Sequence, residues 1–113
     1  MKEVKAVIQP FMLQKVMCEL VKIDHFPGIT ITKVMGLGKG KGRDGVCRFE
    51  EDFIEFKPKV KIEMVVSAEM AEEVVQTIQK NAYTGKKGDG KIWVTDILET
   101  VKISTGKRGE SAI

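Results

Sequence analysis

The sequence predicts an α+β fold in which an antiparallel sheet carries two helices on one face. Three observations predict it: stretches in which apolar and polar residues alternate, two stretches with apolar residues at helical spacing, and the order strand–helix–strand occurring twice around a long glycine-rich segment. The chain has 113 residues, 42% hydrophobic and 31% charged. Because domains commonly run to ~100–150 residues, residues 1–113 are expected to form one domain.

The first strand–helix–strand unit occupies the N-terminal third of the chain. Residues 4–8 alternate in polarity, which predicts a strand that ends at Pro10. Apolar residues then recur at helical spacing over 13–21 and predict a helix of about three turns. The Pro-Gly pair at 27–28 ends the helical region, and the β-branched residues of 29–35 predict a second strand.

The second unit repeats this order after the glycine-rich segment. Residues 59–66 alternate as a strand, and Ser67 is predicted to cap the helix that follows. An apolar stripe over 71–82 marks that helix, and residues 92–103 again have the composition of a strand. The resulting βαβ–loop–βαβ order matches the ferredoxin-like arrangement, which hosts many unrelated functions.

A segment without periodicity separates the two units, at about 37–57. Five glycines lie between positions 36 and 45, and an acidic stretch follows at 50–52. Loops longer than about 12–15 residues inside compact domains are usually functional or disordered. We therefore interpret 37–57 as a flexible loop that carries function.

A second glycine-rich segment, TGKKGDGK at 84–91, joins the second helix to the last strand. Glycine allows positive φ and close approach of the backbone to an anion, successive amide groups can form an anion nest, and lysine adds charge for phosphate oxygens. The order of elements differs from a Walker A loop. The residues alone leave two interpretations open, a phosphate-binding loop and a plain Asp-Gly turn between helix and strand, and they favour the turn slightly.

Several motifs in the same order resemble the PII nitrogen-regulatory signalling proteins. They are TGKKGDGKIWV at 84–94, the first strand with its Pro10-Phe11 break, Gly36-Leu37-Gly38 at the start of the long loop, PKVKIE at 58–63, and the Thr105-Gly106 and Ala112-Ile113 pairs of the tail. Together they cover essentially the whole chain.

The resemblance implies a homotrimer that binds ATP or ADP in clefts between subunits. Residues 88–91 would cradle the phosphates, Glu63 and Val65 would hold the adenine, and Lys102 would reach phosphate from a neighbouring subunit. The full set of nucleotide-binding residues implied by the resemblance is Thr30, Gly36, Leu37, Gly38, Lys39, Glu63, Val65, Thr84, Gly85, Gly88, Asp89, Gly90, Lys91 and Lys102.

Five positions indicate which of the family's ligands this chain is expected to bind. Lys102 and Ser104 stand where relatives usually have arginines, which predicts weaker phosphate contacts because lysine lacks the planar fork. Gly40 replaces a glutamine that helps to hold Mg and 2-oxoglutarate, and glycine offers no side-chain oxygen to a metal. Asp52 replaces a tyrosine that some relatives have uridylylated. Lys59 matches the family's lysine at the loop base and preserves a contact for an anionic metabolite.

These observations predict a regulator rather than an enzyme. Its partner would be a membrane transporter or a metabolic enzyme docked on loop 37–57. His25 is the single histidine and no Ser/His/Asp arrangement is visible. An RNA-binding ferredoxin-like module is a weaker alternative, because such sheets expose stacking aromatics and aromatic content here is 6%. A trimeric adaptor that binds no nucleotide is the other alternative.

The same composition predicts a cytoplasmic protein that neither inserts into a membrane nor binds nucleic acid. Apolar runs are far shorter than the ~20 residues of a membrane helix. The N-terminus lacks the apolar segment of a signal peptide, and two cysteines are too few for a disulfide scaffold.

Overall fold

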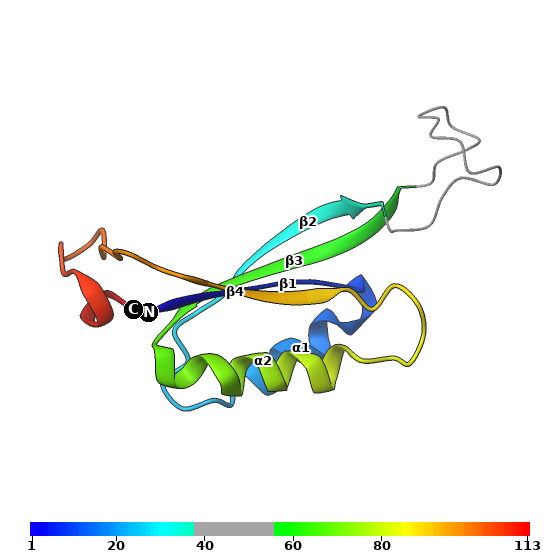
Figure 1. The fold of residues 1–113 in the computed structure, drawn as a ribbon, viewed down its shortest axis with the longest axis horizontal. Coiled ribbons are helices and arrows are strands. Elements are labelled where there is room, and N and C mark those ends of the chain that lie inside the picture. The colour runs from blue at the N-terminus through cyan, green and yellow to red at the C-terminus, as the bar shows by residue number, and fades with distance from the viewer. Residues whose placement is uncertain (38–55) are drawn as a thin grey trace.

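A computed structural model describes residues 1–37 and 56–113 of the chain (Figure 1). Its elements in order are β1 (Lys2–Ile8), a 3₁₀ turn (Pro10–Met12), α1 (Leu13–Leu20), β2 (Thr30–Gly36), β3 (Lys57–Val66), α2 (Ala68–Ala82), β4 (Lys91–Asp96) and a C-terminal 3₁₀ turn (Gly109–Ala112). Most of the predicted loop 37–57 lies outside the described residues, including Gly38, Lys39, Gly40 and Asp52.

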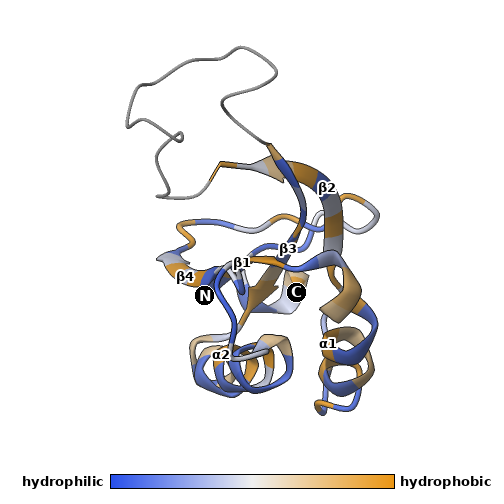
Figure 2. Ribbon diagram, turned by 90° about the vertical axis from the view of Figure 1, so that its right-hand side faces the viewer, coloured by the Kyte–Doolittle hydropathy of each residue, from blue (hydrophilic) through white to orange (hydrophobic). Residues whose placement is uncertain are grey.

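The four strands form one antiparallel sheet in the order β2-β3-β1-β4. Val4 of β1 lies opposite Met64 of β3 on one side and opposite Val94 of β4 on the other. Both helices lie side by side on the same face of this sheet (Figure 2). The predicted α+β, ferredoxin-like fold is therefore confirmed.

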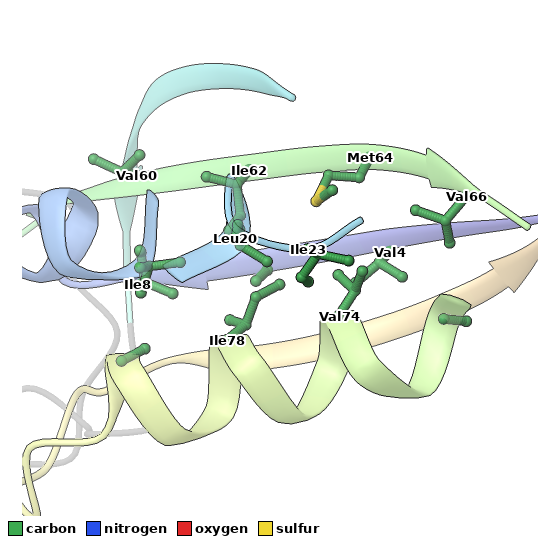
Figure 3. Close-up of a cluster of buried hydrophobic side chains, with 14 residues drawn as sticks. Val4, Ile8, Leu20, Ile23, Val60, Ile62, Met64, Val66, Val74 and Ile78 are labelled. Carbon is green, nitrogen blue, oxygen red and sulfur yellow. The ribbon is translucent and has the colours of Figure 1, made fainter. Parts of the chain in front are cut away.

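The core fills the space between the sheet and the two helices (Figure 3). Alternate residues of β1 and β3, such as Val4 and Ile62, are buried against the helices because successive strand residues point to opposite faces. Leu20 of α1, and Val74 and Ile78 of α2, close the core from the other side. Among the residues that the structure describes, no helix lies on the opposite face of the sheet (Figure 2), which holds the charged residues of the same strands.

The last strand is shorter than the sequence predicts. β4 ends at Asp96, whereas the pattern predicted a strand over 92–103. The physical reason is that β4 pairs with β1, and β1 begins at Lys2. The amide of Ile97 donates to the carbonyl of Met1 at 3.1 Å, and beyond this hydrogen bond β1 has no further strand residue with which β4 could pair. The chain instead folds back on itself through a bridge between Val101 and Arg108, which we call the C-terminal hairpin (residues 100–109).

Two smaller predictions about the helices also differ from the structure. The first helix covers eight residues, about two turns, and the 3₁₀ turn at Pro10–Met12 supplies the third. Ser67 does occupy the cap position of α2, but its side chain makes no capping hydrogen bond. The carbonyl of Ser67 accepts from the amide of Met70 at 3.1 Å instead.

Candidate functional site

The segment 84–91 forms a closed loop between the end of α2 and the start of β4, and Asp89 holds it together. One carboxylate oxygen of Asp89, Oδ2, accepts hydrogen bonds from the amides of Thr84 at 2.7 Å and Gly85 at 3.3 Å. The other, Oδ1, accepts from the Thr84 hydroxyl. These hydrogen bonds, above all the one from the Thr84 hydroxyl, lower the pKa of Asp89 below its ordinary value of 3.8.

Two glycines of this loop adopt positive φ, which favours glycine, and at Gly90 the surrounding space also excludes a side chain. Gly90 has φ +97°, and a Cβ atom there would lie 1.7 Å from the carbonyl oxygen of Val7 in β1. Gly88 has φ +90°, and a Cβ atom there would lie 3.0 Å from Nε2 of Gln9 and 3.3 Å from Nζ of Lys59. The loop therefore presses directly on the end of the central strand, and no other residue fits at Gly90.

Lys59 connects this loop to the base of the long loop. Its ammonium group donates to the carbonyl of Gly88 at 2.6 Å. Its side chain also passes Gly36, where a Cβ atom would lie 3.2 Å from Cγ of Lys59. The side chain of Lys59 therefore lies between Gly36, at the base of the long loop, and Gly88 of the 84–91 loop.

Cations surround the same end of the sheet. Lys86, Lys87 and Lys91 are exposed on or next to the loop, and Lys59 lies beside them on β3. Glycine-rich backbone with exposed amides and a cluster of ammonium groups is suited to an anion such as a phosphate. We call this group, Gly36, Leu37, Lys59 and residues 84–91, the loop half of the site.

Three other predicted residues lie together at a different place. Thr30, Glu63 and Val65 line a solvent-open cavity of about 300 Å³ together with Gly28, Thr100 and the C-terminal Ile113, among other residues. Glu63 lies opposite Thr30 in the β2–β3 register, and its carboxylate lies 3.3 Å from the ammonium group of Lys61. We call Thr30, Glu63, Val65 and this cavity the strand half of the site.

Lys102 lies far from the loop half of its own chain. It sits in the C-terminal hairpin, where its amide donates to the carbonyl of Lys107 at 2.9 Å. Lys91 and Asp96 are the two ends of β4, five residue steps or about 17 Å apart at roughly 3.3 Å per residue, and the hairpin lies beyond Asp96. Figure 1 shows the hairpin in orange and red at one end of the molecule and the yellow 84–91 loop at the other. Within one chain, Lys102 therefore does not reach the loop half.

Some contacts of the site were not anticipated from the sequence. Gln9 and Val7 contact the 84–91 loop, and Thr100 and Ile113 line the cavity of the strand half. A polar residue at the end of a strand carries no sequence signal of its own, and a backbone carbonyl such as that of Val7 carries none at all. Gly38 and Lys39, predicted from the resemblance, lie outside the described residues.

Comparison with known proteins identifies the family. The sequence profile of the family described as nitrogen regulatory protein P-II matches residues 1–107. The chain belongs to the P-II family. It is 42% identical to nitrogen regulatory protein P-II of Azospirillum brasilense and 43% identical to that of Rhodospirillum rubrum, in each case over 113 residues and the whole of both chains.

A third P-II relative gives the same result. Nitrogen regulatory protein P-II 1 of Escherichia coli is 42% identical over 113 residues, again across the full length of both chains. The relatives are named as regulatory proteins and not as enzymes. In the described part of this P-II chain, residues 1–37 and 56–113, every helix is too short or too polar to cross a membrane.

Proposed function

We propose that this P-II family member is a cytoplasmic signal-transduction regulator. It binds ATP or ADP in clefts between the subunits of a homotrimer and controls a partner transporter or metabolic enzyme through loop 37–57. The observation that carries the proposal is the separation of the predicted nucleotide residues into a loop half and a strand half at different places on one chain (Figure 1). A cleft between two copies would bring a loop half and a strand half together.

The loop half supplies what the phosphates of a nucleotide require. Gly88 and Gly90 turn the backbone through positive φ, and Lys59 and Lys91 provide positive charge beside it. Lys59 already donates to a carbonyl of the loop at 2.6 Å, so its ammonium group is held at the place where an anion would approach. Because Gly36 packs against the side chain of Lys59, an anion bound at the loop half would act through this lysine on the base of the long loop.

The strand half supplies groups suited to holding a purine base in a cleft between subunits. Val65 offers apolar surface, and Thr30 and Glu63 offer polar groups at the mouth of the cavity. Lys102 of the C-terminal hairpin adds a cation on the same side of the molecule. In the proposed cleft, this lysine reaches the phosphates that a neighbouring subunit's loop half holds.

Exposed apolar residues support association of several copies. Leu98, just after β4, and Ile103, in the C-terminal hairpin, are fully exposed at 97% and 101%. Trp93 lies opposite Lys5 in the β1–β4 register and therefore on the sheet face that carries no helix, where it is 38% exposed. A two-stranded hairpin is marginally stable by itself in water, so a second subunit over these side chains would stabilise it.

The ligands expected at this site do not include Mg²⁺ and 2-oxoglutarate held in the family's usual way. The proposal rests on Gly40, which has no side-chain oxygen for the metal and lies outside the described residues. Lys59 is the residue of the loop half that would hold an anionic metabolite in their place.

Calorimetric titration with ATP, ADP and AMP, with and without Mg²⁺ and 2-oxoglutarate, tests the proposal. We expect micromolar binding of ATP or ADP, no heat from 2-oxoglutarate, and loss of at least about tenfold in affinity for Lys91→Ala, the equivalent of 1.4 kcal/mol. Lys15→Ala, which removes an exposed lysine from α1, is the matched control and should bind as the unmodified chain does. Absence of heat with every nucleotide would contradict the proposal and leave a trimeric adaptor.

Mixing two defective variants tests whether the site is shared between subunits. Lys91→Ala damages the loop half and Glu63→Gln damages the strand half, so homotrimers of either variant contain no intact site. Unfolding and refolding the two variants together would create mixed trimers in which some clefts combine an intact loop half with an intact strand half. Nucleotide binding recovered in the mixture supports the shared cleft, and a mixture that binds no better than its components contradicts it.

A further inference from the structure

We propose that Asp89 is a positioning residue, whose carboxylate fixes the shape of the 84–91 loop from within and does not contact the ligand. This inference rests on the proposed function of the loop half. It changes the role of a residue that the resemblance placed among the nucleotide contacts.

The carboxylate of Asp89 joins the two ends of the 84–91 loop by hydrogen bonds, an arrangement that we call the clamp. Both of its carboxylate oxygens accept hydrogen bonds from residues four and five positions earlier in the chain, the amides of Gly85 and Thr84 and the hydroxyl of Thr84. Gly88 and Gly90, which flank Asp89 in the chain, both adopt positive φ, and Gly90 lies against the carbonyl of Val7 in β1. The carboxylate is thus occupied in joining the two ends of the loop.

Thr84 extends the clamp by one more hydrogen bond. Its hydroxyl donates to Asp89 and accepts from the amide of Lys86 at 3.2 Å. The side chain of Thr84 therefore links the carboxylate to the turn that carries Lys86 and Lys87. Loss of the hydroxyl should loosen this turn even when the carboxylate is intact, because the amide of Lys86 would lose its side-chain acceptor.

The charge of Asp89 would oppose phosphate binding if the carboxylate faced the ligand. Like charges repel, and a carboxylate has no proton to donate to phosphate near neutral pH. Here the charge is stabilised by the two amides and the hydroxyl, and Lys59, which approaches from β3, adds a favourable Coulombic attraction. The amides and ammonium groups of the rest of the loop are then available to an anion.

The first test uses the protein without ligand and monitors the backbone amides by NMR. We expect the amide signals of Thr84 and Gly85 to shift with pH around a single apparent pKa below 3.8, and to lose this titration in Asp89→Asn. The other titratable side chains on and beside the loop are those of Lys59, Tyr83, Lys86, Lys87 and Lys91. Amides that do not follow Asp89, or a pKa of Asp89 at or above 3.8, would overturn the clamp.

The second test compares nucleotide affinity across two matched pairs of variants. Asp89→Asn keeps the shape and can keep most of the hydrogen bonds, so its dissociation constant should stay within about threefold, whereas Asp89→Ala should lose about tenfold or more. Thr84→Ser keeps the hydroxyl and should bind normally, whereas Thr84→Val should lose affinity as Asp89→Ala does. Should Asp89→Ala fail to fold, the Thr84 pair decides.

Each result of the second test has a definite meaning. Equal losses in Asp89→Asn and Asp89→Ala would show that the charge itself contacts the ligand or its metal and would overturn the inference. Unchanged affinity in Asp89→Ala and Thr84→Val would overturn it as well. An unmodified chain that binds no nucleotide would refute the proposed function and this role of the loop, while the amide titration would still decide whether the clamp exists.

Discussion

The loop half and the strand half of the candidate site differ in what holds them in place. The 84–91 loop is fixed by contacts within its own chain: the Asp89 clamp, the Lys59 hydrogen bond and the close approach of Gly90 to Val7. The C-terminal hairpin, whose Thr100 lines the cavity of the strand half, instead exposes Val101 and Ile103, and its Lys102 does not reach the loop half of its own chain.

This difference indicates that the two halves respond differently to association. A preformed loop loses little conformational entropy when it binds an anion, so the loop half needs only a ligand. In the proposed trimer, a partner subunit would cover the apolar residues of the hairpin and fix the position of the Lys102 side chain. The difference predicts that mutations in the loop half change ligand affinity directly, whereas mutations in the hairpin act first on the oligomer.

The largest effect is expected from Gly90→Ala in the loop half. The new Cβ atom would collide with the carbonyl of Val7 and the backbone would be held at an unfavourable φ, so the free energy of unfolding should fall by more than about 3 kcal/mol. Gly28→Ala is the matched control, because Gly28 has φ +99° but a Cβ atom added there would meet nothing within 4 Å. It should cost only about 1–2 kcal/mol. Urea unfolding measures both, and equal losses would contradict the close packing of Gly90.

The next effect concerns the hairpin and the oligomer. Leu98→Gln combined with Ile103→Gln should shift the protein toward monomers, since each buried apolar side chain contributes about 1.5–3 kcal/mol. Val21→Gln, which changes another exposed apolar residue on the helical layer, should leave the oligomer intact. Analytical ultracentrifugation over a range of concentrations distinguishes these outcomes. A double variant with the assembly state of the unmodified chain would contradict the proposed interface.

A smaller effect is expected for Lys59→Met. Methionine keeps the apolar stem beside Gly36 but cannot donate to the carbonyl of Gly88, so nucleotide affinity should fall by about tenfold while stability changes by about 1 kcal/mol or less. Calorimetry and urea unfolding measure the two quantities. A variant that binds nucleotide as tightly as the unmodified chain would show that Lys59 stabilises the loop but does not contribute to nucleotide affinity.

The smallest effect is a difference in salt dependence between the pKa values of two carboxylates, Asp89 just before β4 and Asp96 at its end. Hydrogen bonds from Thr84 lower the pKa of Asp89, and the hydrogen bond and charge of Lys2 lower the pKa of Asp96. Because both values are lower in the folded protein, the stabilisation is present above about pH 4 and is lost as pH falls through the folded pKa values. NMR titration in about 1 M salt should raise the pKa of Asp96, whose ion pair is exposed, and change that of Asp89 less. Equal salt responses would contradict the difference between a clamp and an ion pair.

Much of the fold could be predicted because it depends on local patterns. Alternation around Val4 and Ile62 located the central strands, and apolar spacing around Leu20 and Ile78 located the helices. The end of β4 was predicted wrongly because residues 97–103 have the composition of a strand but no neighbouring strand to pair with. Strand length depends on the partner as well as on the sequence of the strand itself.

The candidate site was predictable only in part. The composition of 84–91 left both a plain turn and an anion-binding loop open, and the resemblance supplied the nucleotide-binding residues, whose role in binding stays a prediction. That Asp89 turns back onto Thr84 could not be read from the sequence, since an Asp-Gly pair fits a turn, a ligand contact and a clamp equally well.

The amino-acid sequence by itself determined the α+β class, the two helices, the glycine-rich loops and the family, because these follow from periodicity and from motifs in order. Only the tertiary structure decided that Gly90 lies against the carbonyl of Val7, that Lys59 joins Gly36 to Gly88, and that Lys102 lies at the far end of β4 from Lys91. Contacts between residues distant in the chain depend on strand order and register, which no local pattern encodes.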